Sequence, residues 1–244
     1  SSDLALRELS SLTKQEGIRD VILLGMGGSS LGPEVFRASF GSQKGAPRLW
    51  VLDSTVPGWV RLVTESINPA RALFLVASKS GGTIEVMSLF AHFWRLVEKT
   101  RGNRGGQHFI AITDPGTGLE KMAREYGFRR IFSNPPAIGG RYSVLSLFGL
   151  VPAAVLGLDI SRLLARAGKM ADRCHHVRSI ADNPGAYLGV AMGALAKAGR
   201  DKVTILASSP IETFGLWAEQ LLAESTGKET RGIVPVAQEP VLAP

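Results

Sequence analysis

Residues 78–83 read Ser-Lys-Ser-Gly-Gly-Thr and combine three hydroxyl groups, one ammonium group and two glycines. Hydroxyls and backbone N–H groups donate hydrogen bonds to phosphate oxygens, and the N-terminus of a following helix also favours an anion. No acidic side chain interrupts this stretch before Glu85. The segment therefore predicts a phosphate-binding loop; the alternative is a Ser/Thr-rich turn in which Thr83 only caps the helix.

A glycine-rich segment earlier in the chain could also bind an anion. Residues 25–32 read Gly-Met-Gly-Gly-Ser-Ser-Leu-Gly, with four glycines in eight positions, and they follow a short apolar run. Glycines after a buried strand let backbone N–H groups come close to a ligand, and anions bind at the start of the next helix. A tight strand-to-helix turn without a ligand is the alternative.

The spacing of these glycines also bears on a nucleotide-binding hypothesis. In the dinucleotide fingerprint Gly-x-Gly-x-x-Gly, counted from Gly25, the third glycine is replaced by Ser30. Asp53, at the end of the next apolar run, resembles the acid that binds the ribose in such proteins. A nucleotide-binding oxidoreductase is therefore a less favoured alternative, which titration with NAD would test.

Two later segments each place one charged residue near glycine. Residues 138–146 (Ile-Gly-Gly-Arg-Tyr-Ser-Val-Leu-Ser) set Arg141 after a glycine pair and before an apolar run. Residues 220–228 (Gln-Leu-Leu-Ala-Glu-Ser-Thr-Gly-Lys) set Glu224 at the end of an expected helix. Read alone, Arg141 could be an ion-pair partner at a helix terminus, and Glu224 could be an exposed helix residue.

In the order in which they follow one another along the chain, beginning with residues 25–32, the four segments resemble the motifs of the glucose-6-phosphate isomerase family, whose sheets are sugar-isomerase (SIS) domains. The resemblance runs from about residue 20 to the C-terminus. It implies that the substrate phosphate is held by Ser78, Lys79, Ser80 and Thr83. It also implies that Gly28 and Ser29 line the same pocket, that Arg141 is the active-site arginine and that Glu224 is the catalytic base. No metal and no organic cofactor is implied.

The implied reaction is the aldose–ketose isomerisation of glucose 6-phosphate and fructose 6-phosphate, a step of glycolysis and gluconeogenesis. A carboxylate such as Glu224 can move a proton between C2 and C1 through an enediolate. The permanent charge of Arg141 can stabilise the oxyanion that develops, and binding of the remote phosphate positions the reacting carbons. An alternative from another class is a non-catalytic SIS domain that senses a phosphosugar and needs neither residue.

Two features of the family have no counterpart in this sequence. The resemblance implies a ring-opening histidine beyond the glutamate motif and a lysine near the C-terminus, but 20 residues follow Glu224 and none is histidine. The lead before the glycine segment has 24 residues and is shorter than in the family. We therefore expect a fragment of a homodimeric isomerase that binds sugar phosphate weakly and turns over little or none. Fusion to a transaldolase, as in bifunctional transaldolase–glucose-6-phosphate isomerases, would explain the short lead.

Short apolar runs are expected to form the strands that position these segments. They alternate with helical patterns, which indicates strands buried on both faces and hence a parallel α/β sheet. The expected strands are 20–24, 49–52, 72–77, 109–112, 202–207 and, with a weaker signal, 130–132. The expected helices are 33–39, 83–99, 118–126, 142–157, 161–174, 184–198 and about 211–224. The resemblance narrows the class to a three-layer, flavodoxin-like parallel sheet of the SIS type with additional helices.

The chain is expected to hold one domain and part of another. Residues 202–215 repeat the plan of residues 72–85, which is a strand, a serine-rich turn and a helix. We therefore expect residues 1–200 to form a first sugar-phosphate-binding domain with trailing helices. Residues 201–244 are expected to begin a second SIS half that is truncated.

The composition excludes several classes of protein. Hydrophobic residues make up 45% of the 244 residues, which is too apolar for a disordered chain. The net charge of +7 is spread without a long basic run and aromatic residues are only 7%, so the basic residues are interpreted as surface and no nucleic-acid partner is expected. The longest apolar run, residues 144–158, is too short to span a bilayer, so no membrane partner is expected.

The cysteine and histidine residues bear on compartment and metal binding. The single cysteine, Cys174, excludes an internal disulfide and fits a reducing compartment, so a cytoplasmic location is expected. The pair His175 and His176 lacks the i, i+4 spacing of a helical metal site. No metal site is therefore predicted.

Overall fold

The structure is a computed structural model, and it describes residues 2–175 and 179–239 of the chain. The chain divides into two compact units, residues 1–158 and 159–244, and each is described by itself. This division falls before the boundary expected at residues 200 and 201, which stays a prediction. The helices α7 (Ile160–His175) and α8 (Pro184–Lys197) group with the C-terminal elements rather than with the sheet of the first unit. That residues 201–244 begin a second SIS half stays a prediction.

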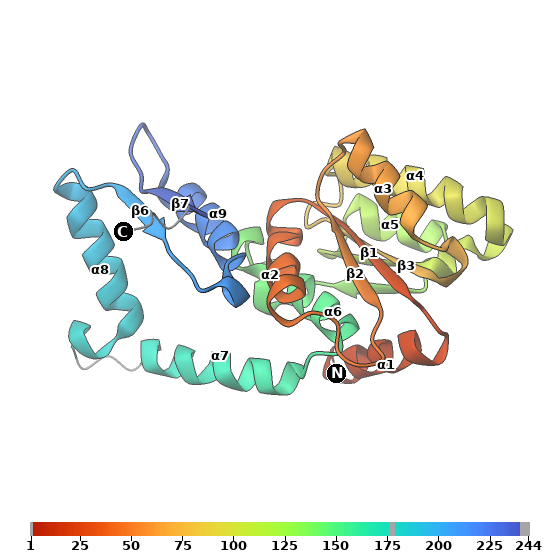
Figure 1. Cartoon of the computed structure of the whole chain (residues 1–244), viewed down its shortest axis with the longest axis horizontal. Coiled ribbons are helices and arrows are strands. Elements are labelled where there is room, and N and C mark those ends of the chain that lie inside the picture. The colour runs from red at the N-terminus through yellow and green to blue at the C-terminus, as the bar shows by residue number, and fades with distance from the viewer. Residues whose placement is uncertain (1, 176–178, 240–244) are drawn as a thin grey trace. The chain divides into compact units, whose positions relative to one another are not determined.

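A five-stranded parallel sheet forms the centre of the first unit (Figure 1). Its strand order is β2-β1-β3-β4-β5. The strands are β1 (Asp20–Gly25), β2 (Arg48–Leu52), β3 (Ala72–Ala77), β4 (Phe109–Thr113) and β5 (Arg130–Ser133). This is the strand order of flavodoxin-like folds. The predicted fold class is confirmed, and the five predicted strands agree with the observed bounds to within one residue at each end.

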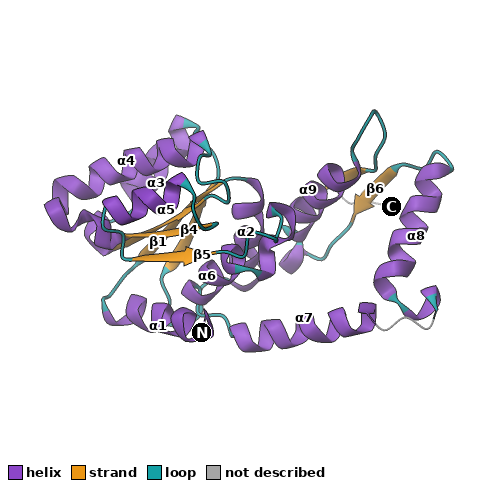
Figure 2. Ribbon diagram, turned by 180° about the vertical axis from the view of Figure 1, so that it is seen from behind, coloured by secondary structure: helices purple, strands orange, loops and turns teal. Residues whose placement is uncertain are grey.

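Helices cover both faces of this sheet and make three layers (Figure 2). One layer contains α3 (Pro57–Ser66), α4 (Ile84–Arg101) and α5 (Gly118–Glu125). The other contains α1 (Ser2–Gln15), α2 (Leu31–Phe40) and α6 (Leu147–Val155). Strand residues alternate between the two layers, so Ile22 packs in the cluster below α3, α4 and α5, while the buried Val21 points to the opposite face. The strands read as continuous apolar runs because both of their faces are buried.

Aromatic side chains fill the centre of the core on the α4 side. The ring centroid of Phe74 lies 5.0 Å from that of Phe93 and 5.0 Å from that of Phe109. All three side chains are fully buried. Such aromatic pairs contribute about 0.5–1.5 kcal/mol each beyond the area they bury. This packing fixes β3 and β4, whose carboxyl ends carry the loops of interest.

The helices of the first unit differ in part from the predictions, which include neither α1 nor α3. The single helix predicted for residues 142–157 is divided into a 3₁₀ segment (Gly140–Leu145) and α6, because Ser146 is extended between them (φ −101°, ψ −171°). The Ser146 hydroxyl donates to the carbonyl of Ser143 at 2.7 Å and stabilises this break. Helix α3 was not predicted, since its ten residues carry little beyond a proline at the first turn to mark them.

The second unit contains α7, α8, α9 (Phe214–Thr226) and a two-stranded parallel sheet of β6 (Lys202–Ile205) and β7 (Val234–Ala237). The predicted start of α8 is confirmed, because the Asn183 side chain accepts a hydrogen bond from the Ala186 amide at 2.9 Å. Strand β6 ends two residues earlier than predicted, and α9 begins three residues later because a 3₁₀ turn (Ser209–Ile211) precedes it. Strand β7 was not predicted, since its sequence contains a proline.

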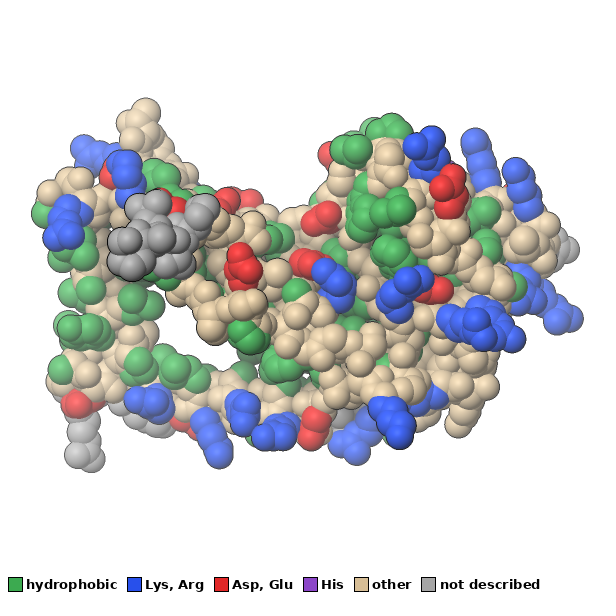
Figure 3. Space-filling model, in the orientation of Figure 1, with side chains coloured by type: hydrophobic (Ala, Val, Ile, Leu, Met, Phe, Trp, Pro, Cys, Tyr) green, Lys and Arg blue, Asp and Glu red, His purple; other side chains and the backbone are tan. Residues whose placement is uncertain are grey.

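No single charge dominates the face shown in Figure 3, whereas exposed apolar side chains gather over α8. Lys and Arg side chains lie scattered on this face, with Asp and Glu among them. This agrees with the interpretation of most basic residues as solvated surface. Within residues 2–175 and 179–239, no helix has both the length and the apolar character that crossing a bilayer requires.

Candidate functional site

The candidate site lies at the carboxyl ends of β1, β3 and β4. The sheet order reverses between β1 and β3, because β2 lies on one side of β1 and the other strands lie beyond β3. Ligands of open α/β sheets bind outside the carboxyl ends of the strands at such a point. A cavity of about 580 Å³ opens there. It is lined by Met26, Gly28, Ser29, Lys79, Ser80, Thr83, Asp114, Pro115, Thr117, Pro136 and Gly140.

Five of the six residues predicted to line the phosphate pocket therefore meet in one cavity, and the sixth, Ser78, lies beneath them. Ser78 is 2% exposed, and its hydroxyl accepts a hydrogen bond from the Gly81 amide at 3.1 Å. The hydroxyls of Ser78 and Thr83 are also hydrogen bonded to each other at 2.9 Å. Ser78 thus supports the loop from below. Thr83 occupies the N-cap position of α4, but its side chain makes no capping hydrogen bond, so its hydroxyl does not stabilise the helix start in the way the alternative expects.

Gly81 gives the loop at residues 78–83 its turn. Its φ of +69° lies in the left-handed region that L side chains rarely adopt. A Cβ at this position would also lie 2.5 Å from the Cβ of Thr117. The sequence therefore uses glycine here for two reasons, and the second brings the loop after β3 against the loop after β4.

The glycine segment after β1 packs directly on the segment that carries Arg141. A Cβ on Gly28 would lie 2.3 Å from the carbonyl oxygen of Gly140, so only glycine allows this approach. The buried Ser143 hydroxyl lies 3.1 Å from the carbonyl oxygen of Gly28 and 2.7 Å from that of Gly140, and it donates between them. Arg141 is half-buried and follows Gly140, which lines the cavity. The position of Arg141 is thus set by a backbone junction.

The ammonium group of Lys79 is held by groups on two neighbouring loops. It forms an ion pair with the Asp114 carboxylate and donates to the carbonyl oxygen of Pro136 at 3.0 Å. The side chains of Lys79 and Asp114 are 31% and 14% exposed. An acidic group therefore lines the same cavity as the predicted phosphate ligands.

Ser30 and Asp53, on which the nucleotide-binding alternative depends, do not line this cavity. Burial raises the pKa of the Asp53 carboxyl, and the neighbouring Glu34 carboxylate raises it further. Asp53 follows β2, as a ribose-binding acid would, but it does not line the cavity. Ser30 is fully buried, and its hydroxyl donates to the carbonyl of Gly27 at 3.0 Å. A side chain therefore fills the place of the third glycine.

Glu224, the predicted catalytic base, lies in the last turn of α9 in the second unit. It is exposed, and its carboxylate accepts a hydrogen bond from the Gln220 amide group at 3.1 Å. It is not among the residues that line the cavity at the ends of β1, β3 and β4. Its role as the base stays a prediction.

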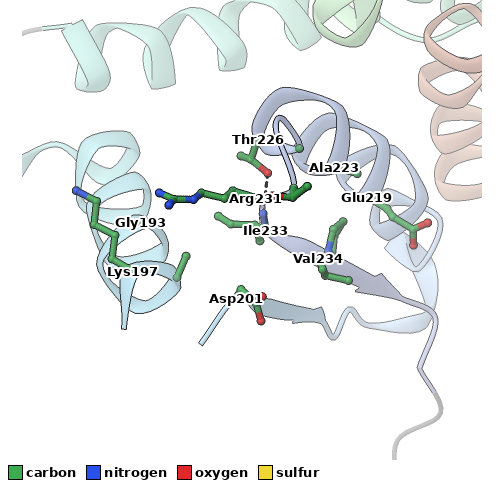
Figure 4. Close-up of a pocket in the computed structure, with 14 residues that line it drawn as sticks. Gly193, Lys197, Asp201, Glu219, Ala223, Thr226, Arg231, Ile233 and Val234 are labelled. Carbon is green, nitrogen blue, oxygen red and sulfur yellow. Dashed lines mark hydrogen bonds between the residues drawn. The ribbon is translucent and has the colours of Figure 1, made fainter. Parts of the chain in front are cut away.

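A second, larger cavity of about 1090 Å³ lies beside the C-terminal end of α9 (Figure 4). Figure 4 shows Arg231 extending from the loop after α9 towards α8. The Thr226 hydroxyl accepts a hydrogen bond from the Ile233 amide at 2.9 Å and donates to the carbonyl of Leu222 at 2.8 Å. This side chain ties the loop back to the helix turn that contains Glu224.

Several site residues were not predicted from the sequence. They are Asp114, Thr117 and Pro136 in the cavity lining and Ser143 at the backbone junction. The expected strand at residues 109–112 ends just before Thr-Asp-Pro. Because the carboxyl ends of parallel strands meet at one edge of the sheet, that position could have identified Asp114.

Asp, Glu, His and Cys are the side chains that could ligate a metal ion. Among the described residues, no group of three or more His, Cys, Asp or Glu side chains could hold a metal ion. His176 lies outside the described residues, so the predicted behaviour of the His175 and His176 pair is not assessed in the structure.

Comparisons with known proteins agree on one family. Residues 10–236 match the phosphoglucose isomerase family. It is 33% identical to the glucose-6-phosphate isomerase of Carboxydothermus hydrogenoformans over 99% of this chain and 54% of that protein. It is 36% identical to the glucose-6-phosphate isomerase of Thermosynechococcus vestitus over 86% of this chain and 40% of that protein. The chain thus spans about half the length, or less, of the curated relatives it matches.

Solved structures show the same fold. A hypothetical protein of Thermus thermophilus superposes with a TM-score of 0.86 at 28% identity, covering 95% of this chain and 56% of that one. A glucose-6-phosphate isomerase of Chlamydia trachomatis superposes with a TM-score of 0.83 at 22% identity, covering 95% of this chain and 47% of that one. The second likeness is one of fold alone.

Proposed function

The chain belongs to the phosphoglucose isomerase family, and we propose that it carries the phosphate site and acid–base residues of a glucose-6-phosphate isomerase. One observation carries the substrate class: the cavity at the ends of β1, β3 and β4 gathers the hydroxyls of Ser29, Ser80 and Thr83 beside glycine backbone. Hydroxyls and backbone N–H groups at the start of a helix are donors for a phosphate monoester. The proposed reaction interconverts glucose 6-phosphate and fructose 6-phosphate.

The phosphate anchors the sugar at one end, and the reacting carbons are handled by charged groups. Ser80 and Thr83 donate to phosphate oxygens, and this binding energy holds the sugar in a reactive position. Arg141, fixed by the junction between Gly28 and Gly140, stabilises the negative charge of the enediolate. Glu224 takes the proton from one carbon and returns it to the other. The reaction needs no cofactor, since the proton stays within the substrate and base.

The remaining proposals concern the setting of the enzyme. Sugar-phosphate isomerisation places the protein in glycolysis and gluconeogenesis. A cytoplasmic location is supported by the single, half-buried Cys174, which fits a reducing compartment. A homodimer is proposed from the resemblance to the family. The expected fusion to a transaldolase stays a prediction, because the relatives compared above carry the name of the isomerase alone.

Calorimetric titration of the 244-residue chain tests the substrate class. Glucose 6-phosphate is expected to bind, and glucose is expected to bind at least 100-fold more weakly because it lacks the phosphate. The S80A/T83A double variant removes two hydroxyls facing an anion, each worth about 1.5–3 kcal/mol, so its affinity should fall by at least 100-fold.

A matched control lies on α4, the helix that follows the loop. The Ser88 hydroxyl of α4 donates to the carbonyl of Ile84 at 2.8 Å and does not line the cavity, so S88A should bind within twofold of the wild type. Equal affinity for glucose and glucose 6-phosphate would contradict the proposed substrate class.

Substitution of Glu224 separates the isomerase from a phosphosugar sensor. Measured in the full-length cellular protein, E224Q should lower turnover by about 10²–10⁴-fold and change KM by less than threefold. The exposed Glu212, just before α9, provides a charge-matched control in E212Q. A wild-type protein that binds glucose 6-phosphate tightly without converting it would favour the sensor.

A further inference from the structure

The loop after β3 is joined to the loops after β4 and β5 through one partly buried ion pair. The Lys79 ammonium contacts the Asp114 carboxylate and donates to the Pro136 carbonyl at 3.0 Å. The backbone amide of Asp114 also donates to the carbonyl of Lys79, at 3.4 Å. The other Asp114 carboxylate oxygen lies 3.4 Å from the side-chain amide nitrogen of Asn134. One residue pair thus connects three loops around the cavity.

This arrangement determines the charge that a phosphate would meet. The side chains of Asp114 and Lys79 are mostly removed from solvent, and both residues line the cavity. Opposite charges in contact largely cancel at the distance of a third group, so the pair offers little net attraction to an anion. Among the residues that line the cavity, the remaining donors are neutral: the hydroxyls of Ser29, Ser80 and Thr83 and the backbone N–H groups of the glycine-rich loops.

We propose that Asp114 is a positioning residue for phosphate binding. Asp114 holds the Lys79 side chain in place, and the resulting ion pair, which we call the strut, fixes the loop at residues 78–83. The phosphate is then bound by Ser80, Thr83 and backbone N–H groups and not by the Lys79 ammonium. The inference rests on the proposed function, since it concerns how the same cavity binds the phosphate of the substrate. It assigns Asp114 a role and changes that of Lys79 from ligand to support.

The two possible roles of Lys79, as a support of the loop or as a direct phosphate ligand, predict opposite effects of one substitution. D114N removes a negative charge from the cavity and keeps the size of the side chain. If Lys79 bound the phosphate directly, the substitution would release its ammonium and tighten binding. If Lys79 is a strut, the substitution loosens the loop and weakens binding, although the cavity has become more positive.

The test is a double-mutant cycle on the full 244-residue chain, with calorimetric titration of inorganic phosphate and of glucose 6-phosphate. D114N and K79M are each expected to weaken binding about tenfold, the equivalent of one charge-assisted hydrogen bond. The affinity of the D114N/K79M double variant should lie within threefold of that of the single variant that binds more weakly, because both substitutions break the same strut. E125Q, an equal change of charge at an exposed position of α5 outside the cavity lining, should bind within twofold of the wild type.

The outcomes separate this inference from the proposed function. A D114N variant that binds phosphate as tightly as the wild type, or more tightly, overturns the strut. A wild type that binds neither phosphate nor glucose 6-phosphate overturns the proposed function instead. Titrations are made well below the melting temperature of each variant, so that reduced affinity reflects the site rather than loss of fold.

A measurement on the wild type covers the case in which D114N does not fold. In a crystal structure with phosphate bound, Lys79 Nζ is expected to stay on Asp114 and on the Pro136 carbonyl. An ammonium that has left Asp114 for a phosphate oxygen overturns the inference.

Discussion

Replacing Gly28 with alanine should disrupt the junction that positions Arg141. The new Cβ would lie 2.3 Å from the carbonyl oxygen and 2.5 Å from the carbonyl carbon of Gly140, where ordinary contact begins at 3.4 Å. Both neighbours are backbone atoms, so no side chain can rotate away. The two segments must therefore separate by roughly 1 Å, and the hydrogen bonds from Ser143 that link them are stretched.

The expected size of the effect follows from this displacement. Overpacking a closely packed region costs about 1–3 kcal/mol, and 2 kcal/mol lowers the melting temperature of a unit of this size by about 4–8 °C. A 1 Å displacement of a catalytic group costs about 10²-fold in rate. G28A should therefore lower the melting temperature measured by circular dichroism and, in the protein at its cellular length, reduce turnover by about 10²-fold.

Gly58, in the first turn of α3, provides the matched control. No atom lies within 4 Å of the position a Cβ would take there, and its φ is not in the left-handed region. G58A should leave turnover unchanged and stabilise by up to about 1 kcal/mol. If G28A melted at the wild-type temperature with full activity, the close approach of Gly28 to Gly140 would not exist in solution and the reasoning would be refuted.

Three further predictions concern other parts of the chain. G81A should weaken phosphate binding at least tenfold and destabilise by more than about 1 kcal/mol, because φ at Gly81 is +69°; unchanged binding by calorimetry would contradict this. Burial lowers the pKa of His108, so the unfolded chain binds more protons, and unfolding free energy should fall as pH drops below about 6.5. H108N, which can still donate to the carbonyl of Ala72, should flatten that part of the pH profile in urea titrations; an unaltered slope would argue against it. T226V removes the acceptor of the Ile233 amide and should speed hydrogen exchange of that amide, whereas wild-type exchange would show the bond to be unimportant.

The sheet was predictable from the sequence because its strands are buried on both faces. A run such as Ala72–Ala77 is apolar throughout and ends in a change to polar and glycine residues, which marks both its type and its end. The break between the 3₁₀ segment and α6 was not predictable, because it depends on contacts between turns. Gly149, for instance, would place a Cβ 1.9 Å from the carbonyl oxygen of Val144.

The loop at residues 78–83 could be located from the sequence for the same local reasons, but the different contacts of its residues could not. Ser78, Lys79, Ser80 and Thr83 are similar in the sequence, since all are donors in one short segment. The structure distinguishes them, because Ser78 is buried beneath the loop and Lys79 is paired with an acid from 35 positions further along the chain. Partners brought together by the sheet leave no trace in the spacing of a single segment.

The central claim is that the cavity at the ends of β1, β3 and β4 binds the phosphate of a sugar phosphate. Nuclear magnetic resonance titration of the ¹⁵N-labelled chain with glucose 6-phosphate tests it most directly. The largest amide shifts are expected in three loops that line the cavity, at residues 26–29, 79–83 and 114–117. Shifts confined to the cavity beside α9, with these three loops unaffected, would contradict it.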